Sequence, residues 1–155
     1  MATPQHGLDL GDQLCFSLYT AQRLVTAAYR PILDTLGLTY PQYVAMLALW
    51  EKAPQTMGEL GEKLGLDYGT VTPLIKRLEA TGLVIREKVP EDQRSVQVNL
   101  TSAGQHLRDQ AVTVPDAIAD AMALDTEEFQ TLKDSLEHLS ANVAQRLGNR
   151  TPSSD

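Results

Sequence analysis

The only cysteine of the chain, Cys15, is the side chain best suited to covalent chemistry. It lies in the apolar segment QLCFSLY (residues 13–19), and Tyr19 follows four residues later, on the same face of a helix. A cysteine thiolate is a nucleophile that peroxides oxidise to sulfenic acid. A lone cysteine in an apolar segment is also often a small buried hydrophobe. From the residues alone, both interpretations stay open.

Two further tyrosines could serve as partners of this cysteine. Tyr29 lies fourteen residues after Cys15, at nearly the same angle but about 21 Å further along a helix axis. It cannot reach Cys15 of its own helix, but it could reach the cysteine of a second chain crossing in the opposite direction. Tyr40, at the start of the next expected helix, is another candidate. Phenolic O–H groups that donate to sulfur stabilise a thiolate.

Other kinds of reactive site have weaker support. A thiol peroxidase stays an alternative, but GDQL before Cys15 offers no Thr or Arg to activate a peroxide, and no second cysteine could resolve the product. The three histidines, His6, His106 and His138, show no metal-ligand spacing. We therefore expect no metal, no cofactor and no enzymatic activity.

Composition favours one globular domain of 155 residues, of which 43% are hydrophobic. No apolar run reaches the roughly 18–20 residues that cross a bilayer, and no signal peptide is evident, so we expect a cytoplasmic protein without a membrane partner. The formal net charge of -7 argues against a nucleic-acid partner only weakly. Residues 101–155 carry four basic and nine acidic groups, whereas residues 56–100 carry six and seven.

The elements that must position these residues follow from hydrophobic spacing and capping signals. Residues 10–36 have an apolar seam of helical period, and Pro31 should bend or interrupt this helix. Thr39 with Gln42, and Thr56 with Glu59, form capping boxes that begin the next two helices.

A helix-turn-helix with a hairpin is expected next, so that residues 39–100 form a winged helix-turn-helix. Asp67 caps DYGTVTPLIKRLEATG (67–82), whose buried stripe is Val71, Leu74, Ile75 and Leu78. The alternating segments LVIREKV (83–89) and VQVNL (96–100) predict a β-hairpin around the turn PEDQRS. The alternation places inward Leu83, Ile85 and Val89, and outward Arg86 and Lys88.

The last third of the chain, residues 101–147, is expected to be helical, with a break at Pro115 and a new start at Asp125 and Glu128. Its final helix carries a long apolar seam. Together with residues 10–36, this region should form the dimerisation helices of a symmetric homodimer. The predicted fold class is mainly α with a small β-hairpin: a winged helix-turn-helix plus N- and C-terminal helices.

Such an architecture binds double-stranded DNA, here a pseudo-palindromic operator. Asp67 begins the helix expected in the major groove, and Arg94 at the wing tip suits the minor groove, with Asp92 bracing its guanidinium. The candidates for base contacts are Tyr68, Thr70, Thr72 and Pro73, and those for phosphates are Lys76, Arg77, Arg86 and Lys88.

This order of elements resembles the MarR family of dimeric winged-helix transcription regulators. PEDQRSVQVNLTSAG (90–104) carries the family's D-x-R pattern as Asp92 and Arg94. Within the family, the chain is most similar to the organic hydroperoxide resistance regulators (OhrR) of the single-cysteine type. That similarity rests on QLCFSLY (13–19), TYPQYVAMLALWE (39–51) and LDYGTVTPLIKRLEATGL (66–83) and covers about residues 10–147.

The resemblance implies that Cys15 is a peroxide sensor and that Tyr29 and Tyr40 of the other subunit hydrogen-bond to it. The protein would be a redox-sensing repressor, released from its operator when an organic hydroperoxide oxidises Cys15. Without a second cysteine, the sulfenate must react with an external thiol, cyclise or over-oxidise. Besides the thiol peroxidase, a second alternative stays open: a MarR-type regulator released by a small phenolic or lipophilic ligand, with Cys15 incidental.

Overall fold

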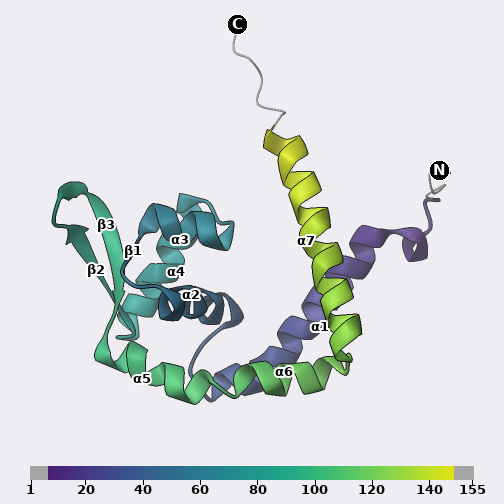
Figure 1. Cartoon of the computed structure of the whole chain (residues 1–155), viewed down its shortest axis with the longest axis horizontal. Helices are drawn as coiled ribbons and strands as arrows, with labels where there is room; N and C mark the ends of the chain where they lie inside the picture. Colours follow the sequence, from purple (N-terminus) through teal and green to yellow (C-terminus); the bar gives the residue numbers. More distant parts are fainter. Residues whose placement is uncertain (1–6, 149–155) are drawn as a thin grey trace, which may run out of the picture. The chain divides into compact units, whose positions relative to one another are not determined.

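The computed structural model describes residues 7–148. It is mainly helical, with one small antiparallel sheet (Figure 1). The chain divides into two compact units, one up to Ile118 and one from Ala119 onward, which are described separately. No helix in the described part of the chain is long and apolar enough to cross a membrane.

The first long helix, α1, spans Leu14–Asp34, so the helix expected from residue 10 begins later. A short 3-10 helix, η1 (Leu10–Asp12), precedes it, and Gln13 between the two is extended. Pro31 was expected to bend or interrupt this helix, and the interruption is wrong, because α1 continues through it. Pro31 lies in the last turn, so the hydrogen bond that it cannot donate is lost only at the end of the helix.

Both expected capping boxes are present. Thr39 begins α2 (Tyr40–Glu51): its hydroxyl accepts the Gln42 N–H, and the Gln42 side chain accepts the Thr39 N–H at 2.9 Å. Thr56 and Glu59 repeat this arrangement at the start of α3 (Met57–Leu64), at 3.1 and 2.7 Å. Local sequence therefore determines where both helices begin.

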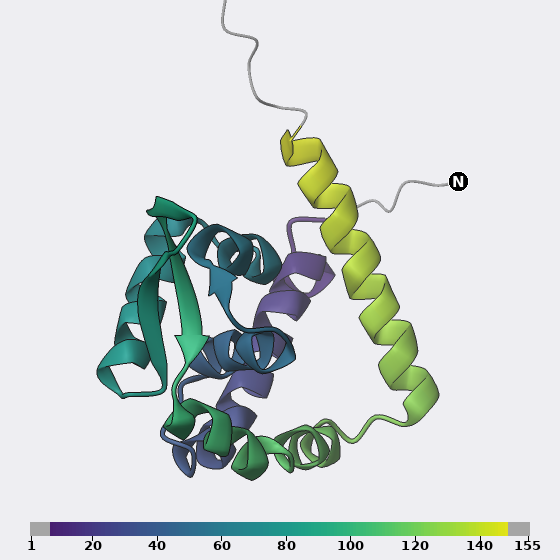
Figure 2. The same cartoon turned by 60° about the vertical axis from the view of Figure 1, so that its left-hand side comes forward.

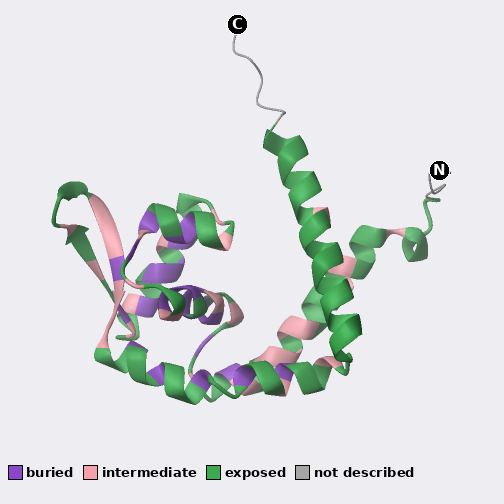
Figure 3. Ribbon diagram, in the orientation of Figure 1, coloured by how far each residue is buried: buried purple, intermediate pink, exposed green. Residues whose placement is uncertain are grey.

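The next helix, α4 (Tyr68–Ala80), completes the helix-turn-helix. Asp67 accepts the Thr70 N–H at 2.8 Å, and Gly65 ends α3 with a φ of 65°. The turn is tight, since a Cβ on Gly61 would lie 2.9 Å from the Leu66 carbonyl oxygen. The predicted stripe is buried in the core between α2, α3 and α4 (Figure 3): Val71, Leu74, Ile75 and Leu78.

The sheet has three strands, in the order β1-β3-β2: β1 (Gln55–Thr56), β2 (Val84–Val89) and β3 (Asp92–Leu100). The hairpin is confirmed, but its turn is Pro90 and Glu91 alone rather than the expected six residues, so Arg94 lies in β3. The two-residue strand β1 was not predicted from the sequence.

The predicted faces of the first hairpin strand are wrong by one residue. Val84 is 2% exposed, whereas Ile85, expected inside, is 43% exposed. Leu83 lies before the strand, next to Gly82 with its φ of 78°, so the pleat begins one residue later than assumed. Arg86 consequently shares the inward face of β2 with Val84. In β3, Val98 is fully buried.

Helix α5 (Ser102–Ala111) packs into the same core as the winged helix. The Trp50 indole N–H donates to the Gly104 carbonyl at 2.9 Å, and Leu107 and Ala111 are buried. Figure 2 shows α5 leaving the end of β3 and passing close to α2. Two residues separate the end of α5 from helix α6 (Val114–Met122). The break expected at Pro115 therefore lies at residues 112–113, and Pro115 itself is in the first turn of α6.

The second unit consists mainly of α7 (Thr126–Gly148). Asp125 and Glu128 exchange backbone-to-side-chain hydrogen bonds of 3.0 and 2.9 Å at its start, as expected. Figure 3 shows α7 exposed almost throughout, and it contains no buried residue. Its large apolar side chains are therefore uncovered: Phe129, Leu132, Leu136, Val143 and Leu147.

Candidate functional site

Cys15 lies exposed in the first turn of α1. The neighbouring side chains of Leu14, Phe16 and Tyr19 are exposed as well. The Arg23 guanidinium lies 5.3 Å from the centre of the Tyr19 ring, a cation–π contact that helps to fix this tyrosine beside the cysteine. Within one chain, Cys15 is therefore not a buried core residue.

Tyr29 and Tyr40 pack against each other where α1 meets the start of α2. Their ring centres are 4.8 Å apart at 48°, and the Tyr43 ring lies 5.8 Å from that of Tyr29. Burial raises the pKa of Tyr29 to about 12, and the neighbouring Tyr40 and Tyr43 phenols add to the shift. Burial also raises the pKa of Tyr43. The Tyr29 phenol is thus protonated at neutral pH and can act as a hydrogen-bond donor.

The structure does not bring Cys15 and this tyrosine pair together within one chain. Cys15 is near the beginning of α1 and Tyr29 near its end, about 21 Å apart at 1.5 Å per residue. Tyr19 lies one helical turn from Cys15 in α1. Each chain therefore carries two separate parts of the expected thiol site.

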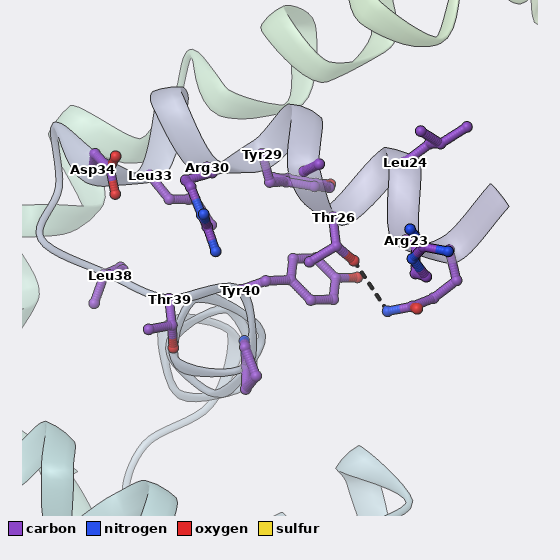
Figure 4. Close-up of a pocket in the computed structure, with 13 residues that line it drawn as sticks. Arg23, Leu24, Thr26, Tyr29, Arg30, Leu33, Asp34, Leu38, Thr39 and Tyr40 are labelled. Carbon is purple, nitrogen blue, oxygen red and sulfur yellow. Dashed lines mark hydrogen bonds between the residues drawn. The ribbon is translucent and has the colours of Figure 1, made fainter. Parts of the chain in front are cut away.

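A cavity of about 820 Å³ lies beside the tyrosine pair, between α1 and the start of α2. Figure 4 shows Tyr40 and Arg30 extending into this space, and the Gln22 amide donating to the Thr26 hydroxyl at 3.1 Å. Arg23 also lines the cavity, and among residues 7–148 neither arginine forms an ion pair. Sequence analysis missed both arginines, although their seven-residue spacing places them on one helix face.

Helix α4 exposes most of the predicted DNA-contacting side chains: Tyr68, Thr70, Pro73, Lys76 and Arg77. Thr72 differs, because its hydroxyl is buried and has no hydrogen-bond partner within residues 7–148. The Asp67 carboxylate is occupied by the Thr70 N–H. Asp67 therefore shapes the start of the helix.

The hairpin of β2 and β3, residues 84–100, is called the wing below. Arg94 is exposed on it, two residues after the strand begins. Asp92 accepts the Arg94 backbone N–H at 3.0 Å and the Ser95 hydroxyl at 2.7 Å. Asp92 thus braces the backbone, and the expected contact with the Arg94 guanidinium is corrected. The Ser95 hydroxyl, followed by the Arg94 N–H, lowers the pKa of Asp92.

Arg86 and Lys88 have different surroundings on the wing. Lys88 is exposed, although it lies on the same face of β2 as Val84 and not on the face expected from sequence. Arg86 instead pairs with Glu79 of α4, and both side chains are about two-thirds buried. Its predicted position on the outer face is wrong, because the pleat of β2 begins one residue later than expected from the sequence. Glu79 was not among the candidates from sequence.

A helix-turn-helix followed directly by a hairpin with basic residues is the fold of winged-helix DNA-binding proteins. The family model for MarR matches residues 38–96. The chain is 42% identical over 139 residues to the organic hydroperoxide resistance transcriptional regulator of Bacillus subtilis, covering 90% of this chain and 95% of that relative. The chain therefore belongs to the MarR family of transcriptional regulators.

Solved structures agree with this assignment. Reduced AbfR bound to DNA matches with a TM-score of 0.77 and 36% identity, over 94% of this chain and 99% of that one. Overoxidized AbfR bound to DNA matches with a TM-score of 0.67 and 40% identity, over 84% and 94%. AbfR is a protein of Staphylococcus epidermidis. Redox states and DNA binding thus occur together in a relative.

Proposed function

We propose that this protein is a dimeric repressor that leaves its operator when an organic hydroperoxide oxidises Cys15. One observation carries the proposal. The Tyr29 and Tyr40 rings lie 4.8 Å apart beside a cavity, while Cys15 is exposed about 21 Å from Tyr29 along α1. A second chain crossing in the opposite direction would join both parts. The name of the Bacillus subtilis relative supports the class of effector.

Exposed apolar surface on both units supports the dimer. On α1, Leu14 and Leu24 are 59% and 65% exposed. In the second unit, α7 and the residues before it form an apolar hollow of about 480 Å³, lined among others by Met122, Leu124, Phe129 and Leu132. A second copy would cover these surfaces, and two-fold symmetry would create two identical thiol sites.

The proposed chemistry uses the thiolate as nucleophile. Its sulfur attacks the terminal oxygen of the hydroperoxide, the O–O bond breaks, and the alkoxide leaves and takes up a proton to become an alcohol. Cys15 becomes a sulfenic acid. An external thiol then condenses with it, giving a mixed disulfide and water. The phenols of Tyr29 and Tyr40 from the other subunit would donate hydrogen bonds to the sulfur before the reaction.

Release would follow from the position of Tyr40. Tyr40 is the first residue of α2, and Trp50, near the other end of that helix, donates a hydrogen bond to the carbonyl of Gly104 in α5, which directly follows the wing. An adduct on Cys15 that displaces Tyr40 would move α2 and, through Trp50, the DNA-reading elements. A rigid helix can carry such a shift from one site to the other.

On DNA, we infer that the exposed N-terminal face of α4 reads the major groove and that Arg94 enters the adjacent minor groove. Lys76, Arg77 and Lys88 are the proposed phosphate contacts. The operator would be pseudo-palindromic, with half-sites about one helical turn apart or a multiple of it.

The test combines operator binding with mass spectrometry of the same sample. Wild-type protein should leave a selected operator duplex after cumene hydroperoxide and show a modified Cys15, whereas Cys15→Ser should stay bound. The mass must be measured, because overoxidized AbfR has been solved bound to DNA. If Cys15→Ser were also released by hydroperoxide, the proposal would be wrong.

A second candidate function is favoured by the cavity itself. Arg23 and Arg30 line it and form no ion pair within residues 7–148, which would suit the carboxylate of a salicylate-like phenolic ligand. In that case salicylate would release both the wild type and Cys15→Ser from DNA, without hydroperoxide. Release that requires hydroperoxide and Cys15 would exclude this candidate as the main signal.

A further inference from the structure

The ion pair between Glu79 and Arg86 joins the two elements proposed to read DNA. Glu79 lies in the last turn of α4, and Arg86 lies in β2 of the wing. Among the side-chain hydrogen bonds and ion pairs of residues 7–148, it is the only one that connects α4 to the wing. Both side chains are about two-thirds buried, so the pair is shielded from water more than a surface pair.

The pair also lies where the wing leaves the core. Along the inward face of β2, Val84 is buried, Arg86 is partly buried and Lys88 is exposed. Arg86 is opposite Val98, which is fully buried, in the neighbouring strand. The pair is therefore the outermost polar link between the domain body and the hairpin.

Glu79 stands at a position where a carboxylate is otherwise unfavourable. The C-terminal end of a helix carries partial negative charge, which repels an anion in the last turn. The Arg86 guanidinium offsets this repulsion. It also supplies a planar donor group, whose geometry fixes direction better than an ammonium group does.

We propose that Glu79 and Arg86 are positioning residues that set the angle of the wing relative to α4, and thereby the placement of Arg94 in the minor groove. The proposal rests on the operator binding proposed above. Arg94 is four residues from Val98 along β3, or about 13 Å. A tilt of about 10° at the base would move Arg94 by about 2 Å, a large shift in a groove about 6 Å wide.

The proposal replaces the phosphate contact expected for Arg86 from sequence, and the two roles predict opposite results for Glu79→Gln. If Arg86 positions the wing, loss of the carboxylate weakens operator binding. If Arg86 binds phosphate, loss of the carboxylate frees the guanidinium, and affinity stays the same or rises.

The experiment measures binding of purified dimers to a duplex selected from a random pool by the wild-type protein. Glu79→Gln and Arg86→Gln should each weaken binding about tenfold, and the exchanged pair Glu79→Arg with Arg86→Glu should recover most of it. In the wild-type background, Arg94→Ala should weaken operator binding about tenfold. In the Glu79→Gln background, the same change should weaken binding less than threefold, because the wing is already misplaced. Glu51→Gln, which removes the 2.7 Å pair with Lys63 between α2 and α3, should change neither affinity nor the effect of Arg94→Ala.

Three outcomes would overturn the proposal. In the first, Glu79→Gln binds the operator as tightly as wild type. In the second, Arg86→Gln lowers the salt dependence of operator binding by about one phosphate contact, while Glu79→Gln does not. In the third, both variants melt at lower temperature but Arg94→Ala costs the same in every background, as expected of a pair that only stabilises the fold. Failure of the wild type to select any duplex would instead refute operator binding itself.

Discussion

The carboxylate of Asp92 accepts a hydrogen bond of 3.0 Å from the backbone N–H of Arg94. Together with the 2.7 Å bond from the Ser95 hydroxyl, it holds the backbone at the start of β3, next to the hairpin turn. The acidic residue of the D-x-R pattern thus shapes the backbone that carries the arginine. Asp92 is exposed, so its influence depends on these hydrogen bonds rather than on burial.

Protonation of Asp92 should loosen the wing tip. The Ser95 hydroxyl and the Arg94 N–H lower its pKa in the folded protein, so its stabilising contribution is present above the ordinary value of 3.8 and disappears as the pH falls through the lowered pKa. The Arg94 amide resonance in NMR spectra should shift with a midpoint below that ordinary value. In Asp92→Asn this titration should vanish, and operator affinity should fall several-fold. A midpoint at or above the ordinary value would contradict the assigned hydrogen bonds.

Gly104 should tolerate no side chain. A Cβ at this position would overlap the Leu83 carbonyl at the base of the wing, and that backbone atom cannot move without displacing β2. We expect Gly104→Ala to lower the free energy of unfolding by about 2–3 kcal/mol, as measured by urea denaturation. Gly58→Ala in α3 is the control, because its Cβ would come no nearer than 3.9 Å to a neighbour. Equal stability of the two variants would refute this close packing.

The exposed apolar face of α7 should be needed for dimerisation. Leu132 and Leu136 are 49% and 38% exposed, and a charge at either would be buried unpaired if a second chain covers them. Leu136→Glu should shift the protein toward monomer in analytical ultracentrifugation and weaken operator binding. Ser135→Glu, one residue away on the same helix, should stay dimeric. Dimers of unchanged stability for both variants would exclude this face from the interface.

The sequence predicts the helices of this fold better than its wing, and the reason is physical. The caps at Thr39, Thr56 and Asp67 are local interactions over three residues, so they can be recognised from spacing alone. The strand faces depend on where the pleat starts, and Gly82 shifts that start by one residue. An error of one residue exchanges Ile85 with Val84 and turns Arg86 inward.

The candidate site shows a similar division. Cys15, Tyr29 and Tyr40 could be selected from residue type, spacing and family resemblance. The pairing of Arg86 with Glu79 could not, because it depends on how the hairpin packs on α4. The position of Arg23 and Arg30 beside the cavity likewise depends on the meeting of α1 with the start of α2.

The central claim is that Cys15 of one chain reacts in a site completed by Tyr29 and Tyr40 of the other. Homodimers of Tyr29→Phe/Tyr40→Phe should react with cumene hydroperoxide about tenfold more slowly at Cys15, since the sulfur loses its donors. Tyr43→Phe is the matched control, because Tyr43 packs 5.8 Å from Tyr29 but is not proposed to contact sulfur. It should react at the wild-type rate.

The most direct measurement uses a mixed dimer, purified through two tags, of a Cys15→Ser chain with a Tyr29→Phe/Tyr40→Phe chain. Its single Cys15 faces the intact tyrosines of the partner only if the site is shared between chains. The account predicts oxidation of that cysteine at the wild-type rate, measured by mass spectrometry over time. Oxidation as slow as in the Tyr29→Phe/Tyr40→Phe homodimer would contradict it.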